Sequence, residues 1–242
     1  MPKPRLDQLL VDRGLAVSRE RAKSLILAGS VSVNGQRADK PGHAVPPDAR
    51  VELAARQPYV SRGGFKLAGA LDHWRIGVAG LICFDAGAST GGFTDCLLQR
   101  GAAKVYAFDV GHGQLDWRLR HDPRVVCRES VNLRHPEAAG PLEPIDLAVC
   151  DVSFISATLI LPTLAALLAP GGAMIVLVKP QFEVGKEEVG KGGIVKDPAL
   201  HAAACSRVRE AAGRLGFGRT DLIASPILGA EGNREFLLHA TH

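Results

Sequence analysis

The chain has few cysteines, and none of them are closely spaced. Its five cysteines are spread over 242 residues and form no Cys-x-x-Cys pair or other metal-site spacing. Three lie in apolar runs typical of strands, so we interpret them as small buried side chains in a reducing compartment. The sequence therefore predicts no metal centre and a cytoplasmic location.

The chain also lacks an obvious export or membrane-spanning segment. The N-terminus, MPKPRLDQLL, has no apolar core of signal-peptide length. One uncharged stretch covers residues 159–178, but Pro162 and the Pro170-Gly171-Gly172 turn interrupt it. A helix followed by a buried strand explains this stretch better than a membrane span does. We expect a soluble protein without membrane partners.

Net positive charge is missing from most of the chain and is confined to its N-terminal part. Residues 1–57 contain ten Lys and Arg residues against six Asp and Glu residues, an excess of four. This excess equals the net charge of +4 of the whole chain, so the remaining residues are neutral in sum. A basic module on a neutral body favours a polyanionic partner, although a solvated basic face is the alternative.

Residues 1–57 have the pattern of a small α/β domain. Ser18 is a suitable N-cap for a second helix, and Asn34-Gly35 is a typical hairpin turn. The expected elements are helices over 5–14 and 18–29, a hairpin over 30–39 and a strand over 50–53.

This pattern, carried by RLDQLLVDRGLAVSRERAKSLILAGSVSVNGQRADKPGHAV, resembles the S-four-like RNA-binding domain of ribosomal protein S-four, pseudouridine synthases and tyrosyl-tRNA synthetases. The resemblance implies a basic surface that reads the backbone and shape of structured RNA. The expected RNA contacts, in the domain and the linker after it, are Arg5, Arg19, Arg21, Lys23, Lys40 and Arg62.

Beyond a linker over 58–64, apolar strands alternate with helices. This alternation predicts a parallel sheet covered on both faces. Residues 219–227 and 233–241 indicate two more strands with a short connection, which favours an antiparallel hairpin at the sheet edge. We expect residues 65–242 to form a Rossmann-like α/β domain with a mostly parallel seven-stranded sheet and an antiparallel last strand. The other expected strands lie near 81–85, 104–109, 124–128, 145–151 and 173–179, and the helices near 63–74, 92–100, 156–168 and 198–215.

A glycine-rich turn, DAGASTGGF, follows the first of these strands. Ser89 interrupts the GxGxxG spacing of dinucleotide sites, and the P-loop lysine is absent. A generic nucleotide or packing turn is one interpretation. The turn resembles instead the first motif of S-adenosylmethionine-dependent methyltransferases, in which an acid faces the cofactor's ammonium group. The cofactor contacts that this resemblance implies are Asp85, Gly87, Ala88, Ser89, Gly91, Gly92 and Phe93.

Further polar residues follow the next two strands. Asp109 ends the second strand about 20 residues beyond the first acid, the usual place of a partner for ribose hydroxyls. A turn cap is its alternative role. Glu129 and Asn132 follow the third strand, where the resemblance implies adenine.

Four charged residues lie next to apolar segments of the same domain. Asp151 and Lys179 end two strands, Glu235 precedes the last strand, and Lys66 lies in a helix among apolar neighbours. Ligands of open α/β sheets bind where the carboxyl ends of the strands meet. Each residue taken alone fits a solvated strand end, or a lysine lying along an apolar surface. Together beside a cofactor loop, they indicate an active site.

These residues match the Lys-Asp-Lys-Glu set of FtsJ-like RNA ribose 2′-O-methyltransferases. With the N-terminal domain, the whole chain resembles rRNA methyltransferases of the hemolysin-A (TlyA) type, through SRGGFKL, DAGASTGGFTD, CDVSFIS, VKPQFE and GNREFL. The resemblance implies S-adenosylmethionine as cofactor, ribosomal RNA or ribosomal subunits as partner, and a cytidine ribose as acceptor.

In this interpretation Lys179 is the base or orients the hydroxyl, and a nearby Lys66 lowers its pKa. Asp151 orients Lys179 beside the methyl donor, and Glu235 holds Lys66 or the ribose. Gly63-Gly64 is a hinge between the RNA-binding domain and the helix of Lys66. No metal is required.

Two other classes of function are open. A non-catalytic rRNA-binding or ribosome-assembly factor would fit the N-terminal domain, but the intact catalytic set argues against it. A membrane-active hemolysin is disfavoured by the lack of a span or a strongly amphipathic cationic helix. Residues 181–196, rich in glycine and lysine, form either a lid or RNA clamp or a disordered loop.

Overall fold

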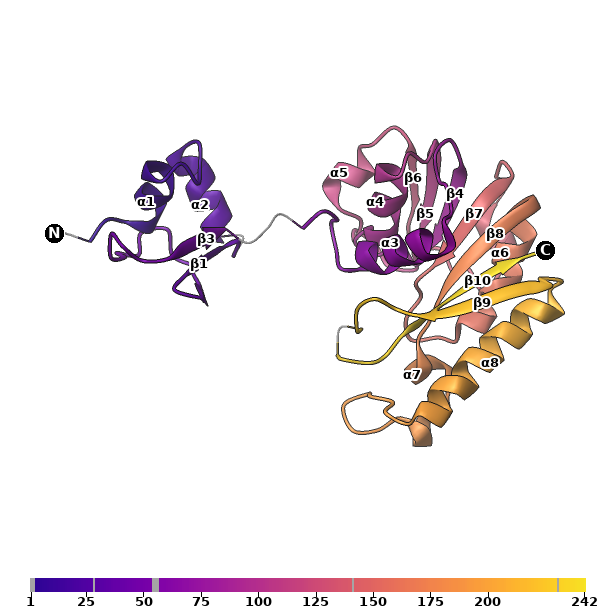
Figure 1. Cartoon of the computed structure of the whole chain (residues 1–242). Coiled ribbons are helices and arrows are strands. Elements are labelled where there is room, and N and C mark those ends of the chain that lie inside the picture. The colour runs from indigo at the N-terminus through magenta and orange to yellow at the C-terminus, as the bar shows by residue number, and fades with distance from the viewer. Residues whose placement is uncertain (1–2, 28, 54–56, 141, 230) are drawn as a thin grey trace. The chain divides into compact units, whose positions relative to one another are not determined.

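A computed structural model describes residues 3–27, 29–53, 57–140, 142–229 and 231–242. The chain divides into two compact units, Met1–Pro58 and Tyr59–His242 (Figure 1). Residues 54–56, just before the expected linker, lie outside the described residues.

The smaller unit has the expected order of two helices, a hairpin and a further strand. Asn34 and Gly35 both have positive φ, of 52° and 80°, as a two-residue hairpin turn requires. Ser18 caps the second helix by accepting a hydrogen bond from the Arg21 amide at 3.2 Å. Residue 28, in the expected last turn of that helix, lies outside the described residues. The elements are α1 (Leu6–Asp12), α2 (Arg19–Leu27), β1 (Val31–Val33), β2 (Gln36–Arg37) and β3 (Val51–Leu53), with the strand order β2-β1-β3.

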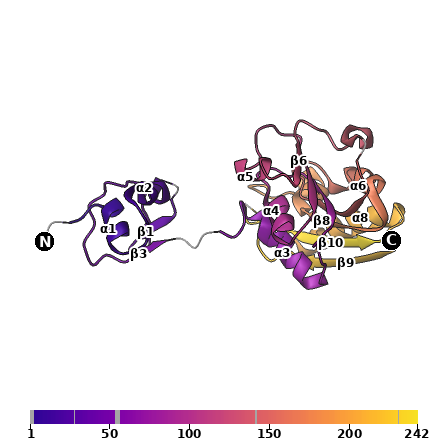
Figure 2. The same cartoon turned by 90° about the horizontal axis from the view of Figure 1, so that it is seen from above.

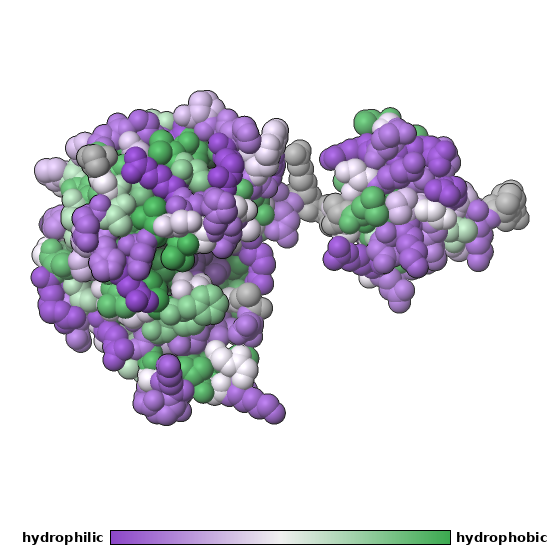
Figure 3. Space-filling view, turned by 180° about the vertical axis from the view of Figure 1, so that it is seen from behind, coloured by the Kyte–Doolittle hydropathy of each residue, from purple (hydrophilic) through white to green (hydrophobic). Residues whose placement is uncertain are grey.

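The core of this unit is small, and its surface is polar. Leu6 and Leu10 of α1 are fully buried against Ile26 of α2. On the face that Figure 3 shows, hydrophilic side chains cover most of the unit. A polar exterior of this kind suits a charged or hydrated partner.

The larger unit contains the expected sheet of seven strands, in the order β6-β5-β4-β7-β8-β10-β9. Strands β4 to β8 pair in parallel, and β10 is antiparallel to both β8 and β9. The expected mostly parallel sheet with an antiparallel last strand is confirmed. The strands are β4 (Ile82–Ala86), β5 (Lys104–Phe108), β6 (Val125–Arg128), β7 (Ile145–Cys150), β8 (Leu168–Val178), β9 (Arg219–Ala224) and β10 (Phe236–Thr241).

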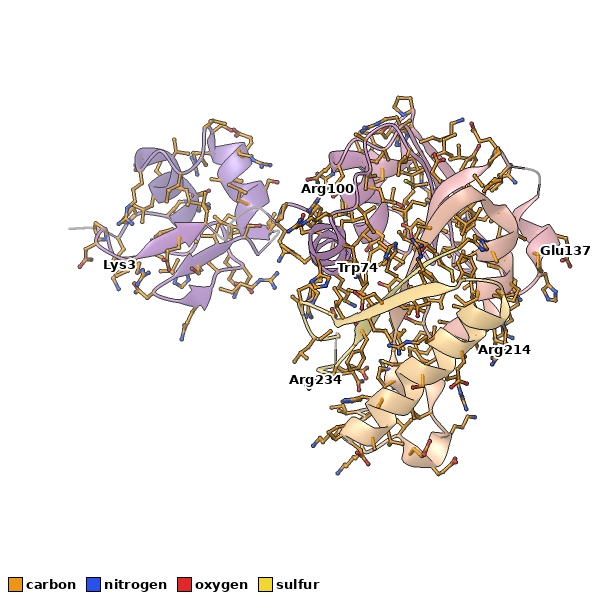
Figure 4. All side chains as sticks on the ribbon, turned by 45° about the vertical axis from the view of Figure 1, so that its right-hand side comes forward. Lys3, Trp74, Arg100, Glu137, Arg214 and Arg234 are labelled. Atoms are coloured by element: carbon orange, nitrogen blue, oxygen red, sulfur yellow. The ribbon has the colours of Figure 1, made fainter. Side chains whose placement is uncertain are left out.

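Helices cover both faces of this sheet (Figures 1 and 2). Helices α3 (Gly63–Trp74), α4 (Gly92–Gln99) and α5 (Trp117–Arg120) lie on one face, and α6 (Leu161–Leu167) and α8 (Pro198–Arg214) on the other. Alternate residues of each strand enter the two cores: Cys83 faces α3 and α4, whereas Phe84 faces α6 and α8. Trp74 at the end of α3 donates from Nε1 to Asp221 of β9 at 2.8 Å, which docks the helix against the sheet edge (Figure 4).

The segment after β7 differs from the expected single helix over 156–168. It contains the short helix η2 (Ala157–Leu159) and then α6, because Pro162 suits only the first turn of a new helix. The next strand begins at Leu168, earlier than expected. Four short helices of the described residues were not expected: α5, η1 (Pro136–Ala139), α7 (Pro180–Glu183) and η3 (Lys186–Glu188).

The sheet topology explains where the site forms. Strands β4, β7 and β8 are parallel neighbours, so the residues that follow them lie along one edge. In the antiparallel pair, Phe236 of β10 lies opposite Val178 of β8. Register therefore brings Glu235, which precedes β10, to the edge where Lys179 follows β8.

Candidate active site

Lys66 and Glu235 form a buried ion pair. Lys66 Nζ lies 2.6 Å from Glu235 Oε2, and the two residues are 8% and 4% exposed. Lys66 lies on the buried side of α3 beside Leu67 and Ala70. This position explains why its neighbours in the sequence are apolar. Each partner compensates the buried charge of the other, so loss of either one would leave an uncompensated charge away from water.

Lys179 and Asp151 form a second ion pair at the same edge. Lys179 Nζ lies 2.6 Å from Asp151 Oδ1 and donates a hydrogen bond to Ser153 Oγ at 2.7 Å. Sequence reasoning missed Ser153, although it stands two residues after the strand-end acid in CDVSF. Each lysine thus has its own carboxylate, and the expected influence of Lys66 on Lys179 stays a prediction.

Two cavities meet at these lysines. A cavity of about 170 Å³ is bordered by the glycine loop, and a cavity of about 390 Å³ lies on the side of Glu235. Lys66, Lys179 and Ser153 line both of them. A molecule bound in the first cavity and a second molecule bound in the other would therefore meet beside the amines of Lys66 and Lys179.

The glycine loop approaches Asp151 closely. Gly87 has φ of +83°, and a Cβ on it would lie 2.7 Å from the Asp151 carbonyl oxygen. Only glycine fits such a position without a shift of the backbone. Most of the predicted cofactor residues line the smaller cavity, namely Gly87, Ala88, Ser89, Gly92, Phe93 and Asp151.

Asp85 lies just before this loop but lines neither cavity. Its side chain is fully buried, and Oδ2 accepts a hydrogen bond from Thr94 Oγ1 of α4 at 2.6 Å. Oδ1 is buried without a hydrogen-bond partner. Burial raises the pKa of Asp85 to about 7. A cationic group close to Oδ1 would stabilise the ionised form of Asp85.

Asp109 orders the backbone around the loop. Its oxygens accept hydrogen bonds from the Ser89 amide at 2.8 Å and the Gly111 amide at 2.7 Å. Both interpretations from the sequence are compatible with this position, because a carboxylate oxygen can accept more than one hydrogen bond.

Glu129 and Asn132 do not line either cavity. Glu129 accepts from the Gly113 amide at 2.9 Å and from Arg120 at 2.7 Å. Hydrogen bonds from the Gly113 backbone and from Arg120 lower the pKa of Glu129 to about 2, against the opposing effect of burial. Asn132 is exposed and accepts from the Arg134 amide at 3.2 Å. Glu129 thus holds the 113–115 turn in this structure.

The side chains predicted to contact RNA differ in the hydrogen bonds that they already make within the protein. Arg5 donates two 3.0 Å hydrogen bonds to the buried Asp7, and Arg19 donates a third at 3.1 Å. Hydrogen bonding to Arg5 is the largest cause that lowers the pKa of Asp7, to about 2. Arg62 donates to the Leu228 carbonyl oxygen at 2.8 Å. The remaining three, Arg21, Lys23 and Lys40, are exposed.

The glycine pair before Lys66 is helical, whereas the sequence suggested a hinge. Gly63 and Gly64 begin α3, and Gly64 is buried. A Cβ on Gly64 would lie 2.2 Å from Tyr59 Cγ, and Gly92 of α4 packs against the same turn. Glycine at these positions therefore allows the first turns of α3 and α4 to pack closely against each other.

Two family models match the chain. An FtsJ-like methyltransferase model matches residues 59–242, and an S4 domain model matches residues 4–51. The 16S/23S rRNA (cytidine-2′-O)-methyltransferase TlyA of Mycobacterium tuberculosis is 49% identical over 97% of this chain and 88% of its own length. Hemolysin A of Brachyspira hyodysenteriae is 42% identical over 97% of this chain and 98% of its own.

Solved structures agree with these matches. A protein of Streptococcus thermophilus described as a hemolysin has a TM-score of 0.75 and 45% identity, covering 100% of this chain and 89% of its own. An O-methyltransferase of Bacillus cereus with a TM-score of 0.53 and 18% identity covers 77% and 84%, and shows the fold alone. Within the described ranges, no helix combines the length and the apolar character of a membrane span. The chain therefore belongs to the FtsJ-like methyltransferase family and has the N-terminal S4 domain of its TlyA-type relatives.

Proposed function

We propose that the protein transfers a methyl group from S-adenosylmethionine to the 2′-hydroxyl of a cytidine ribose in ribosomal RNA. The observation that carries this proposal is the junction of two cavities at Lys66 and Lys179, each paired with a buried or half-buried carboxylate. The names of the TlyA relatives, which specify cytidine-2′-O methylation, support the choice of acceptor. Because the proposed substrate is ribosomal RNA, the protein would act in the cytoplasm.

The smaller cavity suits the methyl donor. The backbone of Gly87, Ala88 and Ser89 borders it, and a loop without large side chains admits the amino acid part of the cofactor. The unpartnered Oδ1 of Asp85 fits an interaction with its ammonium group. Asp109, bonded to the Ser89 amide, would hold the ribose hydroxyls where they extend beyond this cavity. Asn132 lines neither cavity, so its contact with the adenine stays a prediction. When bound, this cofactor supplies a methyl group on a positively charged sulfur.

The residues of the junction suit attack by a ribose hydroxyl. This hydroxyl is a poor nucleophile until its proton is removed, and alignment supplies much of the rate. Lys179, after losing one proton to solvent, would take the hydroxyl proton as the methyl group is transferred, and this would restore the ammonium that pairs with Asp151 in the structure. Ser153 would fix the direction of Lys179 Nζ. The Lys66–Glu235 pair would hold the ribose from the other cavity.

RNA recognition would use both units. Arg21, Lys23 and Lys40 are free to contact phosphates, and Arg5 and Arg19 present partly exposed guanidinium groups. In the larger unit, Phe154 is 88% exposed and lines the larger cavity. An exposed aromatic ring beside an acceptor pocket suits stacking on an unpaired base.

Tritium-labelled S-adenosylmethionine and unmodified ribosomal subunits test this function. The wild-type chain should label rRNA, and Lys179→Ala should still bind cofactor but label rRNA far less. A wild-type chain that binds rRNA and cofactor without labelling would instead support a non-catalytic assembly factor. Cofactor binding should be measured by calorimetry on both chains, so that loss of folding is not mistaken for loss of chemistry.

A further inference from the structure

Glu183 is a buried carboxylate that the mechanism above does not use. It ends α7, four residues after Lys179, and is only 2% exposed. Its Oε2 accepts from Ser156 Oγ at 2.5 Å, and its Oε1 accepts from the Ala157 amide at 2.7 Å. The side chain thus joins the segment after β8 to the segment after β7.

The segment 152–156 is fixed at both ends. At its start, the Asp151 amide donates to the Ala86 carbonyl oxygen at 2.9 Å. At its end, the Glu183 carboxylate holds Ser156 and Ala157. Arg207 of α8 donates to the Glu183 carbonyl oxygen, so the backbone that bears this carboxylate is anchored to α8.

The middle of this segment is strained and exposed. Phe154 has φ of +67°, a left-handed conformation that costs a non-glycine residue roughly 1–2 kcal/mol. Its ring is almost fully exposed and lies 5.4 Å from that of Phe182. Such a conformation persists only when the surrounding structure imposes it. The neighbouring Ser153 accepts the hydrogen bond from Lys179.

We propose that Glu183 is a positioning residue for the acceptor nucleotide. Through Ser156 and Ala157 it holds the segment that presents Phe154 at the mouth of the larger cavity and Ser153 to Lys179. This inference rests on the proposed function, because it concerns the RNA side of the same site. Among the described residues, the side chain of Glu183 bonds to Ser156 and Ala157 and not to the glycine loop that borders the smaller cavity, so cofactor binding should be independent of it.

Three variants and one control test the proposal. Glu183→Ala removes both acceptors. Glu183→Gln keeps an oxygen for the Ala157 amide and offers its amide to Ser156, whose hydroxyl can then donate to Thr158 Oγ1, 2.6 Å away. Val208→Ala truncates a fully buried core residue of α8 and controls for a general loss of stability. Ser156→Ala removes one of the two hydrogen bonds and serves if Glu183→Ala does not fold.

The readouts are rRNA methylation kinetics, cofactor affinity by calorimetry, and hydrogen exchange at residues 152–157. Glu183→Ala should lower kcat/KM for ribosomal subunits by about 10- to 100-fold, mainly because the acceptor nucleotide of the RNA is held less well. It should leave cofactor affinity unchanged and speed exchange of the Ala157 amide. Glu183→Gln should restore most activity and protection, and Ser156→Ala should fall between them.

Parallel loss of cofactor affinity and activity, or a profile equal to that of Val208→Ala, would overturn the proposal. So would a Glu183→Ala chain with wild-type kinetics. A wild-type chain that methylates no ribosomal RNA would refute the proposed function itself, and the acceptor role of Glu183 with it. The exchange measurement would in that case still report whether Glu183 holds the segment.

Discussion

Alanine at Gly92 should destabilise the larger unit, whereas alanine at Gly63 should not. A Cβ on Gly92 would lie 2.3 Å from Ser61 Oγ, 2.9 Å from the Gly64 amide nitrogen and 3.1 Å from the Gly63 Cα. Two of these neighbours are backbone atoms of α3, which cannot rotate away. A Cβ on Gly63 would meet Phe93 at 3.5 Å, an ordinary contact.

The two substitutions share one benefit and differ in one cost. Each glycine is the first residue of its helix, so both gain the same part of the roughly 0.5–1 kcal/mol by which alanine is favoured in the middle of a helix. Overpacking costs typically 1–3 kcal/mol, and only Gly92→Ala incurs it. The free energies of unfolding should therefore differ by about 2 kcal/mol. For a unit of this size, that difference corresponds to roughly 4–8 °C in Tm.

Thermal unfolding followed by circular dichroism measures this difference, and calorimetry measures cofactor affinity alongside it. Gly92→Ala should also weaken S-adenosylmethionine binding, because Gly92 and Ser61 both line the smaller cavity. The reasoning would be refuted if Gly92→Ala were as stable as the wild type. It would equally fail if Gly63→Ala lost as much stability as Gly92→Ala.

Three further predictions follow from buried charges. Lys66→Met should destabilise the chain by about 3–5 kcal/mol because it strands Glu235, and adding Glu235→Gln should recover most of this loss in urea unfolding; additive losses would contradict a coupled pair. The folded-state pKa of Asp85 is about 7, above its ordinary value of 3.8. The folded chain therefore holds this proton more tightly than the unfolded chain does. As a result, the free energy of unfolding should fall by up to roughly 4 kcal/mol as pH rises from 4 to 7. Urea unfolding of Asp85→Asn across this range should show a flatter profile, and an unchanged slope would count against the assignment. The pKa of Asp7 is lowered to about 2, so the stability it adds is present above pH 4 and lost as pH falls toward 2; Asp7→Asn should lower the Tm of the smaller unit at pH 7 but match the wild type near pH 2.

Much of the site follows from the sequence because parallel strands end together. Asp151 and Lys179 each follow a run of apolar residues, and such runs predict neighbouring buried strands. The antiparallel direction of β10 then brings Glu235 to the same edge. These inferences need only periodicity and topology, which local sequence encodes.

Contacts between segments distant in sequence could not be predicted in this way. Nothing near Ser153 indicates that it meets Lys179, and the pairing of Arg5 and Arg19 with Asp7 depends on how α1 and α2 pack. The hinge expected at Gly63-Gly64 stays a prediction, but the close packing of both glycines was missed for a related reason. Flexibility is the local property of glycine, whereas close approach of Tyr59 and α4 is a tertiary property.

The most direct test of the account is the identity of the methylated atom. Unmodified ribosomal subunits should be incubated with the wild-type chain and S-adenosylmethionine, and their rRNA digested to nucleosides for mass spectrometry. The account predicts the appearance of 2′-O-methylcytidine, in far lower yield after incubation with Lys179→Ala. A methyl group on a base, or equal yields from the two chains, would contradict the assignment of the junction at Lys66 and Lys179 as the place where ribose meets the methyl donor.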